Sequence, residues 1–112
     1  MRRETLSAIA DIRLAIERIS SAVANVEDER YLADWMIQSA VERQLLVVGE
    51  AMVRIRDLDP GVFNQIPDGL RIISLRNLLA HGYDAVDAKT LLRLAREKLP
   101  KLDSILGNLL LG

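Results

Sequence analysis

Apolar residues recur along the first third of the chain with the spacing of a helix that packs lengthwise on another helix. Their separations alternate between three and four residues, which places them in one stripe on the surface of an α-helix. The stripe consists of Ile9, Ile12, Ile16, Ile19, Val23 and Val26. Asp28 and Glu29 follow it, and carboxylates favour the N-terminus of a helix. The pattern predicts one helix over this stripe and the start of a second helix near residue 29.

The second predicted helix runs from about Glu29 to Leu58 and stops at Asp59-Pro60-Gly61. One apolar stripe follows it, and further apolar residues widen that stripe beyond what a surface helix needs. The stripe is Ile37, Val41, Leu45, Val48, Met52 and Ile55, widened by Leu32, Trp35, Met36, Leu46 and Val47. Such a helix is either central to a bundle or part of an interface. We favour the interface, and hence a homodimer, because the chain is short.

Two more helices are expected after an irregular stretch. Asp68 is a plausible cap for a helix from Leu70 to about His81, and Gly82 is well placed to end it. The last helix begins near Asp87 and contains Pro100, where we expect a kink or a break. The prediction is an all-α fold, a single domain over residues 1–112, built as an up-and-down bundle of four to five helices that dimerises through helices.

Composition narrows the functional classes. The chain has 112 residues, of which 50% are hydrophobic, and 15 basic residues nearly balance 16 acidic ones. This balance excludes a uniformly basic nucleic-acid coat but not a local basic patch. The absence of cysteine excludes disulfides and thiolate metal sites. No apolar run approaches the ~20 residues of a membrane helix, and Glu4 interrupts any signal peptide after Arg2-Arg3. A cytoplasmic protein without membrane contact is expected.

Candidate chemistry is concentrated between Ser74 and Asp84, which include the only histidine of the chain. Asn77 and His81 are four residues apart and share a helix face, whereas Arg76 and His81 diverge by about 140° on an ideal helix. A histidine can move the proton of a ribose 2′-hydroxyl, and an arginine can neutralise charge on phosphate oxygens. This residue set suits cleavage of a phosphodiester without a metal or cofactor.

The number of histidines complicates this interpretation. Cleavage by attack of a 2′-hydroxyl requires both a general base and a general acid, and one chain supplies only one histidine, His81. A twofold dimer would supply a second histidine. The alternative is structural: a histidine in the last turn of a helix interacts favourably with the helix dipole, and Tyr83 would simply close the helix end. Spacing alone leaves both interpretations open.

The sequence from Arg76 to Tyr83 resembles the Arg-x4-His-x-Tyr motif of the HEPN superfamily, specifically its HepT-like toxin family. Three further segments are similar to the layout of that family, and the similarity covers roughly residues 5 to 110. They are Ala40-Val41-Glu42-Arg43-Gln44-Leu45 with Val48-Gly49-Glu50-Ala51, Tyr83-Asp84-Ala85-Val86-Asp87, and Lys98-Leu99-Pro100. Four ordered segments make the resemblance far more specific than the motif alone.

The resemblance implies a helical bundle that dimerises with two motifs facing each other across a cleft. It implies a metal-independent endoribonuclease, the toxin of a prokaryotic toxin–antitoxin pair, with Arg76 and His81 as the catalytic pair and Asn77 as a polar helper. It also implies a small nucleotidyltransferase antitoxin that attaches AMP to Tyr83. AMP there would add negative charge and bulk beside the catalytic groups.

Other polar residues receive weaker assignments. Arg43 and Glu50 are seven residues apart on one face of the second helix, and we expect a structural role, with Arg43 paired to Glu50 or to an acidic residue of a second subunit. Glu50 and Arg54 fit an ordinary helix-surface pair. Arg71 is the best candidate for an additional RNA contact. The competing functions are a non-catalytic helical partner of a nucleotidyltransferase, which binds protein or nucleotide, and a dimeric bundle without chemistry.

Overall fold

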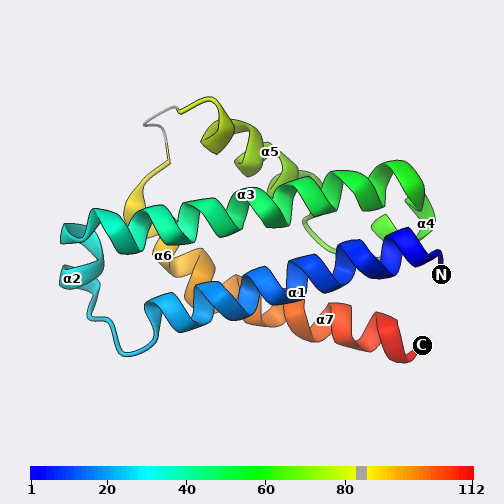
Figure 1. Ribbon diagram of the computed structural model, residues 1–112, viewed down its shortest axis with the longest axis horizontal. Coiled ribbons are helices and arrows are strands. Elements are labelled where there is room, and N and C mark those ends of the chain that lie inside the picture. The colour runs from blue at the N-terminus through cyan, green and yellow to red at the C-terminus, as the bar shows by residue number, and fades with distance from the viewer. Residues whose placement is uncertain (83–85) are drawn as a thin grey trace.

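Helices α1 (Arg3–Val23) and α3 (Trp35–Leu58) run antiparallel along the length of the molecule and form its centre (Figure 1). The computed structural model describes residues 1–82 and 86–112, and all regular secondary structure in these ranges is helical. The predicted stripe of α1 is buried as far as Val23. Val26 lies past the helix end, after Asn25 has turned the backbone with φ of 58°. The first helix is therefore confirmed, but the apolar stripe in the sequence extends about one turn beyond the end of the helix.

The remaining main helices are α5 (Gly69–Ala80) and a C-terminal helix made of α6 (Ala88–Arg93), the π-helical turn η1 (Leu94–Lys98) and α7 (Leu99–Leu111). Successive main helices alternate in direction, as the up-and-down prediction requires (Figure 1). Two short helices, α2 (Asp28–Ala33) and α4 (Pro60–Phe63), make the corners. In the described part of the chain, no helix is long and apolar enough to cross a membrane.

The prediction of one unbroken helix from Glu29 to Leu58 is wrong, because Asp34 separates α2 from α3. Asp34 has extended backbone angles, and its carboxylate accepts hydrogen bonds from the amides of Met36 and Ile37 at 3.0 and 3.2 Å. A carboxylate that satisfies two free amides stabilises the start of a new helix. The side-chain amide of Gln38 donates to the Tyr31 carbonyl oxygen at 2.8 Å, which satisfies the end of α2.

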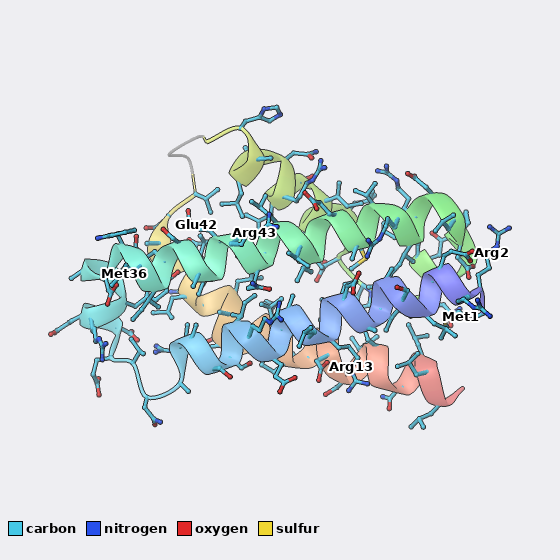
Figure 2. All side chains as sticks on the ribbon, viewed as in Figure 1. Met1, Arg2, Arg13, Met36, Glu42 and Arg43 are labelled. Carbon is cyan, nitrogen blue, oxygen red and sulfur yellow. The ribbon has the colours of Figure 1, made fainter. Side chains whose placement is uncertain are left out.

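The apolar stripe of α3 belongs to the core of the protomer. Val41, Leu45 and Val48 are buried, and α1 is the main packing partner of α3. Of the two interpretations of this helix, its central position in the bundle is the one observed, and the stripe is not an exposed interface. Apolar residues that widen the stripe remain on the surface at the start of α3, where Trp35 is 72% and Met36 is 63% exposed (Figure 2).

The predicted stop at Asp59-Pro60-Gly61 is confirmed, but the stretch after it is more regular than expected. Asp59 ends α3 and caps α4, with its carboxylate accepting from the Val62 amide at 3.4 Å. Thr5 of α1 donates its hydroxyl proton to the same carboxylate at 3.3 Å. Asp59 therefore attaches the corner between α3 and α4 to the first turn of α1.

Pro100 does not break the C-terminal helix, contrary to one of the two outcomes expected for it. The irregularity lies one turn earlier, in η1, where the Leu99 amide donates to the Leu94 carbonyl oxygen five residues before it. A proline ring in an α-helix collides with the carbonyl four residues back, and a wider turn relieves this collision. The helix therefore continues through Pro100 with a local change of winding.

Ion pairs join the helices at the surface. Arg13 of α1, labelled in Figure 2, meets Asp103 of α7, with 2.9 Å between Nε and Oδ1. Arg54 of α3 meets Asp11 of α1 at 2.6 Å. The hydrogen bond to Asp103 and its negative charge raise the pKa of Arg13. Exposed pairs of this kind contribute only about 0–1 kcal/mol each, so the apolar core carries most of the stability.

Candidate active site

Helix α5 carries the residues of the predicted motif. It spans Gly69–Ala80, which confirms the predicted helix to within one residue at each end. Asp68 occupies the cap position as expected, but its side chain makes no capping hydrogen bond and instead lies 3.8 Å from Arg71. Gly82 has φ of 65°, a conformation that glycine adopts without strain, and it follows directly after the last helical turn. In Figure 1, α5 crosses α3 and its C-terminal end rises away from the bundle.

Two glycines let α5 approach its neighbours closely. A Cβ atom on Gly49 of α3 would lie 2.2 Å from the Cβ of Arg76, and one on Gly69 would lie 2.7 Å from the ring of Phe63. Both distances are shorter than real carbon atoms tolerate, so neither position accepts a larger residue without movement. The side chain of Arg76 therefore lies directly on the backbone of α3 at Gly49, and we call this contact surface the seat of Arg76.

Arg76 is half-buried on this seat, with one guanidinium nitrogen, Nη1, donating to Oδ1 of Asn77 at 2.8 Å. Its Nε is buried and has no hydrogen-bond partner. The other half-buried arginines, Arg13 and Arg56, both pair with a carboxylate, at 2.9 and 3.1 Å. Among the described residues, no carboxylate pairs with Arg76. A partly desolvated cation without a counter-charge attracts an anion such as phosphate.

His81 follows the last residue of α5 and is exposed, with its backbone amide donating to the Asn77 carbonyl oxygen at 3.2 Å. Because α5 is regular up to Ala80, Arg76 and His81 point about 140° apart around its axis. Asn77 is exposed and belongs to the helix face of His81 while holding Arg76 by its amide. Asn77 thus contacts both Arg76 and His81, because its side-chain oxygen accepts from Arg76 and its backbone oxygen accepts from the His81 amide. Tyr83 lies outside the residues that the structure describes.

The polar pair expected on α3 is not found. Arg43 and Glu50 are both exposed, and in residues 1–82 and 86–112 no ion pair joins them. Arg54 also has a different partner from the predicted Glu50, because it meets Asp11 of α1. Figure 2 labels Glu42 and Arg43 on the stretch of α3 nearest the C-terminal end of α5. Among the described residues, no carboxylate pairs with Arg43.

Sequence reasoning assigned no role to Gly49, although the signal was present. A glycine in the interior of a long helix costs about 0.5–1 kcal/mol relative to alanine, so its presence indicates a close approach. What a sequence does not give is the partner, here the side chain of a residue 27 positions later.

Where the structure describes the chain, no three histidine, aspartate or glutamate side chains gather as a metal site would require.

Comparison with known proteins identifies the family of the chain. The family model described as "Ribonuclease HepT-like" matches residues 12–109. A protein of Thermococcus cleftensis named "Probable ribonuclease HepT" is 31% identical over 102 residues, covering 91% of this chain and 92% of the relative. A protein of Methanocaldococcus jannaschii named "Putative RNase MJ1380" is 26% identical over 101 residues, covering 90% of this chain and 92% of the relative. No solved structure matches the chain significantly.

The chain therefore belongs to the HepT-like ribonuclease family, as the motif from Arg76 to Tyr83 indicated. The match runs from the middle of α1 to near the end of α7, so the family relation rests on the sequence of most of the bundle and not on the motif alone.

Proposed function

We propose that the protein is a metal-independent endoribonuclease. The observation that carries the proposal is the state of Arg76: it is fixed on α3 by Gly49, held by Asn77, and is the half-buried arginine without a carboxylate partner. Membership of a ribonuclease family supplies the class of substrate. Arg76 would bind the phosphate oxygens, which gain negative charge as the 2′-oxygen attacks.

His81 would transfer the proton in this reaction. Its exposure at the end of α5 leaves it accessible to a long substrate such as RNA, and an imidazole exchanges protons near neutral pH. Asn77 is a positioning residue, because it holds the guanidinium of Arg76 through the 2.8 Å hydrogen bond. Arg71, exposed one turn and a half before Arg76, remains a proposed RNA contact.

A second copy of the chain would complete the site. Since Arg76 and His81 diverge on α5, and since one chain has a single histidine, a twofold dimer would bring the second proton-transfer group. The buried stripe of α3 is unavailable for this contact, so other apolar residues must make it. Those exposed on α2, at the start of α3 and on α5 are Leu32, Trp35, Met36, Leu70 and Leu78.

The proposed biological role is that of a toxin in the cytoplasm, neutralised by a nucleotidyltransferase antitoxin. This role rests on the family resemblance of the motif and on the position of Tyr83 two residues after His81. AMP attached to the phenol would add a negatively charged phosphodiester to the motif, which would compete with RNA for Arg76. Intact mass of the protein purified with and without a co-expressed cognate nucleotidyltransferase would reveal the modification, and Tyr83→Phe should abolish it.

Cleavage of total RNA by the purified protein in EDTA tests the enzymatic proposal. His81→Ala should reduce the rate by about 10²- to 10⁴-fold, the usual contribution of a general acid or base. Arg18→Ala, which removes an exposed arginine of α1, is the matched control and should cleave like the wild type. Cleavage that survives in His81→Ala would contradict the assigned role. A wild type that is unmodified yet inactive would favour the alternative, a non-catalytic partner of a nucleotidyltransferase.

Mixed dimers test whether both histidines serve one cleft. When wild type and His81→Ala are co-expressed in equal amounts and purified together, about a quarter of the twofold dimers carry two histidines. Activity should therefore fall to about a quarter of the wild-type value if each cleft needs both, and to about half if each protomer works alone. The second result would remove the dimer from the mechanism while leaving the ribonuclease proposal intact.

A further inference from the structure

A cavity of about 290 Å³ lies between the start of α5 and the C-terminal helix. The start of α5 forms one wall, and η1 with the first half of α7 forms the other. Most of its lining is aliphatic, contributed by Ile72, Leu75, Leu94, Leu99, Leu102 and Ile105. The π-helical winding of η1 belongs to this wall, and such turns are frequent where helices form functional sites.

The polar part of the cavity is strongly cationic. Arg71, Lys98 and Lys101 line it against a single carboxylate, that of Asp68. Asp68 lies 3.8 Å from Arg71, whereas no carboxylate of the described residues pairs with Lys98 or Lys101. The chain has only three lysines, and two of them are here. Three cations against one anion leave the rim with an unbalanced positive charge.

The lining distinguishes this cavity from an extension of an RNA groove. Proteins hold single-stranded bases by stacking them on aromatic side chains, and the described lining residues include none. Leucine and isoleucine walls instead favour an aliphatic chain, whose burial releases water from both surfaces. At ~30 Å³ for each non-hydrogen atom, the share of a water molecule in the liquid, the volume accommodates roughly ten such atoms.

We propose that this cavity binds a small amphipathic anion, an alkyl carboxylate of about eight carbon atoms, with its tail among the aliphatic residues and its head between Lys98 and Lys101. The occupant bridges two helices that have different neighbours, since α5 packs mainly on α3 whereas α7 packs on α1. Ile72 and Leu75 of α5 would gain an apolar contact on their open side. Binding therefore attaches the helix that carries Arg76 more firmly to the bundle.

Calorimetric titration of the full chain with sodium octanoate, below its micellar concentration, tests the site without RNA. We expect saturable binding of one octanoate per chain, with butanoate and uncharged 1-octanol binding more weakly. Lys98→Gln with Lys101→Gln should weaken octanoate by roughly three- to tenfold, as the loss of two partly exposed charge contacts implies. Lys89→Gln, which removes the third lysine at a place outside this cavity, is the matched control and should bind as the wild type does.

A second variant separates binding in the cavity from adsorption to the surface. Ile105→Trp fills the cavity from a half-buried position and should abolish octanoate binding while the thermal unfolding transition remains cooperative. Amide exchange of Leu70–Ala80 should slow when octanoate is bound. The proposal is overturned if octanol binds as tightly as octanoate, if the two-lysine variant binds unchanged, or if exchange in α5 does not respond. None of these outcomes depends on ribonuclease activity.

Discussion

The pair α1–α3 and the helix α5 are attached to the molecule in different ways. Each member of the pair buries seven or more side chains or glycines in a common core, whereas α5 buries only Gly69 and Ile73. The apolar residues of α5 are instead half-buried or exposed, Leu70 at 65% and Leu78 at 39%. Helix α5 therefore packs on the core mainly through half-buried residues, Ile72, Leu75 and Leu79, rather than through a fully buried apolar face.

The difference separates stability from function. The long pair supplies a rigid surface, and α5 places Arg76 and His81 on it through contacts at Gly49 and Phe63. A helix with few buried contacts opens more easily than the core does, and it keeps apolar surface available for a second copy, a substrate or a ligand. Substitutions in the two regions should consequently affect different measurements.

The largest expected effect on stability comes from a substitution in the pair α1–α3. Ile12 is fully buried, and Ile12→Ala should lower the free energy of unfolding by about 2–5 kcal/mol, because it removes apolar contacts and leaves a cavity. Leu70→Ala, in α5, should change it by no more than about 0.5 kcal/mol. Urea denaturation of both variants measures the contrast. Equal losses would show that α5 is as integral to the core as α1 is.

A smaller effect is expected at the junction of the two regions. Replacing a helical glycine by alanine ordinarily stabilises a helix by about 1 kcal/mol, but at Gly49 the new methyl group would meet the Cβ of Arg76. Gly49→Ala should therefore destabilise by about 1–3 kcal/mol and displace Arg76. RNA cleavage should fall further than stability accounts for.

Gly107→Ala in α7 is the control for that variant. Its new Cβ would lie 3.4 Å from the flexible end of Arg13, an ordinary contact, so the propensity gain should prevail. Thermal unfolding of the two variants should shift in opposite directions. A stabilised and fully active Gly49→Ala would show that the seat of Arg76 is not tight.

The smallest expected effect on stability concerns Tyr31, a buried residue of α2. Tyr31 is fully buried, and its hydroxyl has no hydrogen-bond partner among the residues that the structure describes. Burial together with the charge of Glu42 raises the pKa of its phenol. The folded protein therefore holds this proton to a higher pH than the unfolded chain does. The resulting contribution to stability is complete below the unfolded pKa of about 10 and is lost as pH rises through the folded value.

Tyr31→Phe removes both the unsatisfied hydroxyl and this titration. It should stabilise the protein by about 1 kcal/mol at neutral pH and make unfolding less sensitive to alkali. Urea midpoints at neutral and alkaline pH, for the variant and the wild type, measure both changes. A variant less stable than the wild type at neutral pH would indicate that the hydroxyl has a partner in solution.

The sequence was sufficient for the features that depend on neighbouring residues. The stripe of α1, the bounds of α5 and the turn at Gly82 follow from local periodicity and backbone preference, and the structure confirms them. The four main helices and the position of the Arg76 motif on one of them were predicted in the same way.

Features that depend on distant residues were not predicted. The break at Asp34 depends on neighbouring residues and was still missed, because the apolar pattern continues across it and only the capping geometry of the carboxylate distinguishes two helices from one. The stripe of α3 was assigned to an interface because periodicity does not tell whether the covering helix comes from the same chain. Arg54 was paired with Glu50 by its spacing, whereas the fold brings Asp11 to it from α1.

The π-helical turn η1 has a consequence for insertions and deletions. Its hydrogen bond spans five residues instead of four, so the turn contains one residue more than an α-helix uses to cover the same arc. Removing one codon there, for example that of exposed Glu97, would force ordinary α-helical winding on this segment and bring the Pro100 ring back against the carbonyl four residues before it. A chain that lacks one residue at this point should therefore keep a continuous C-terminal helix only if it also lacks the proline, and it would lose the wide turn that forms part of the cavity wall beside Lys98 and Lys101.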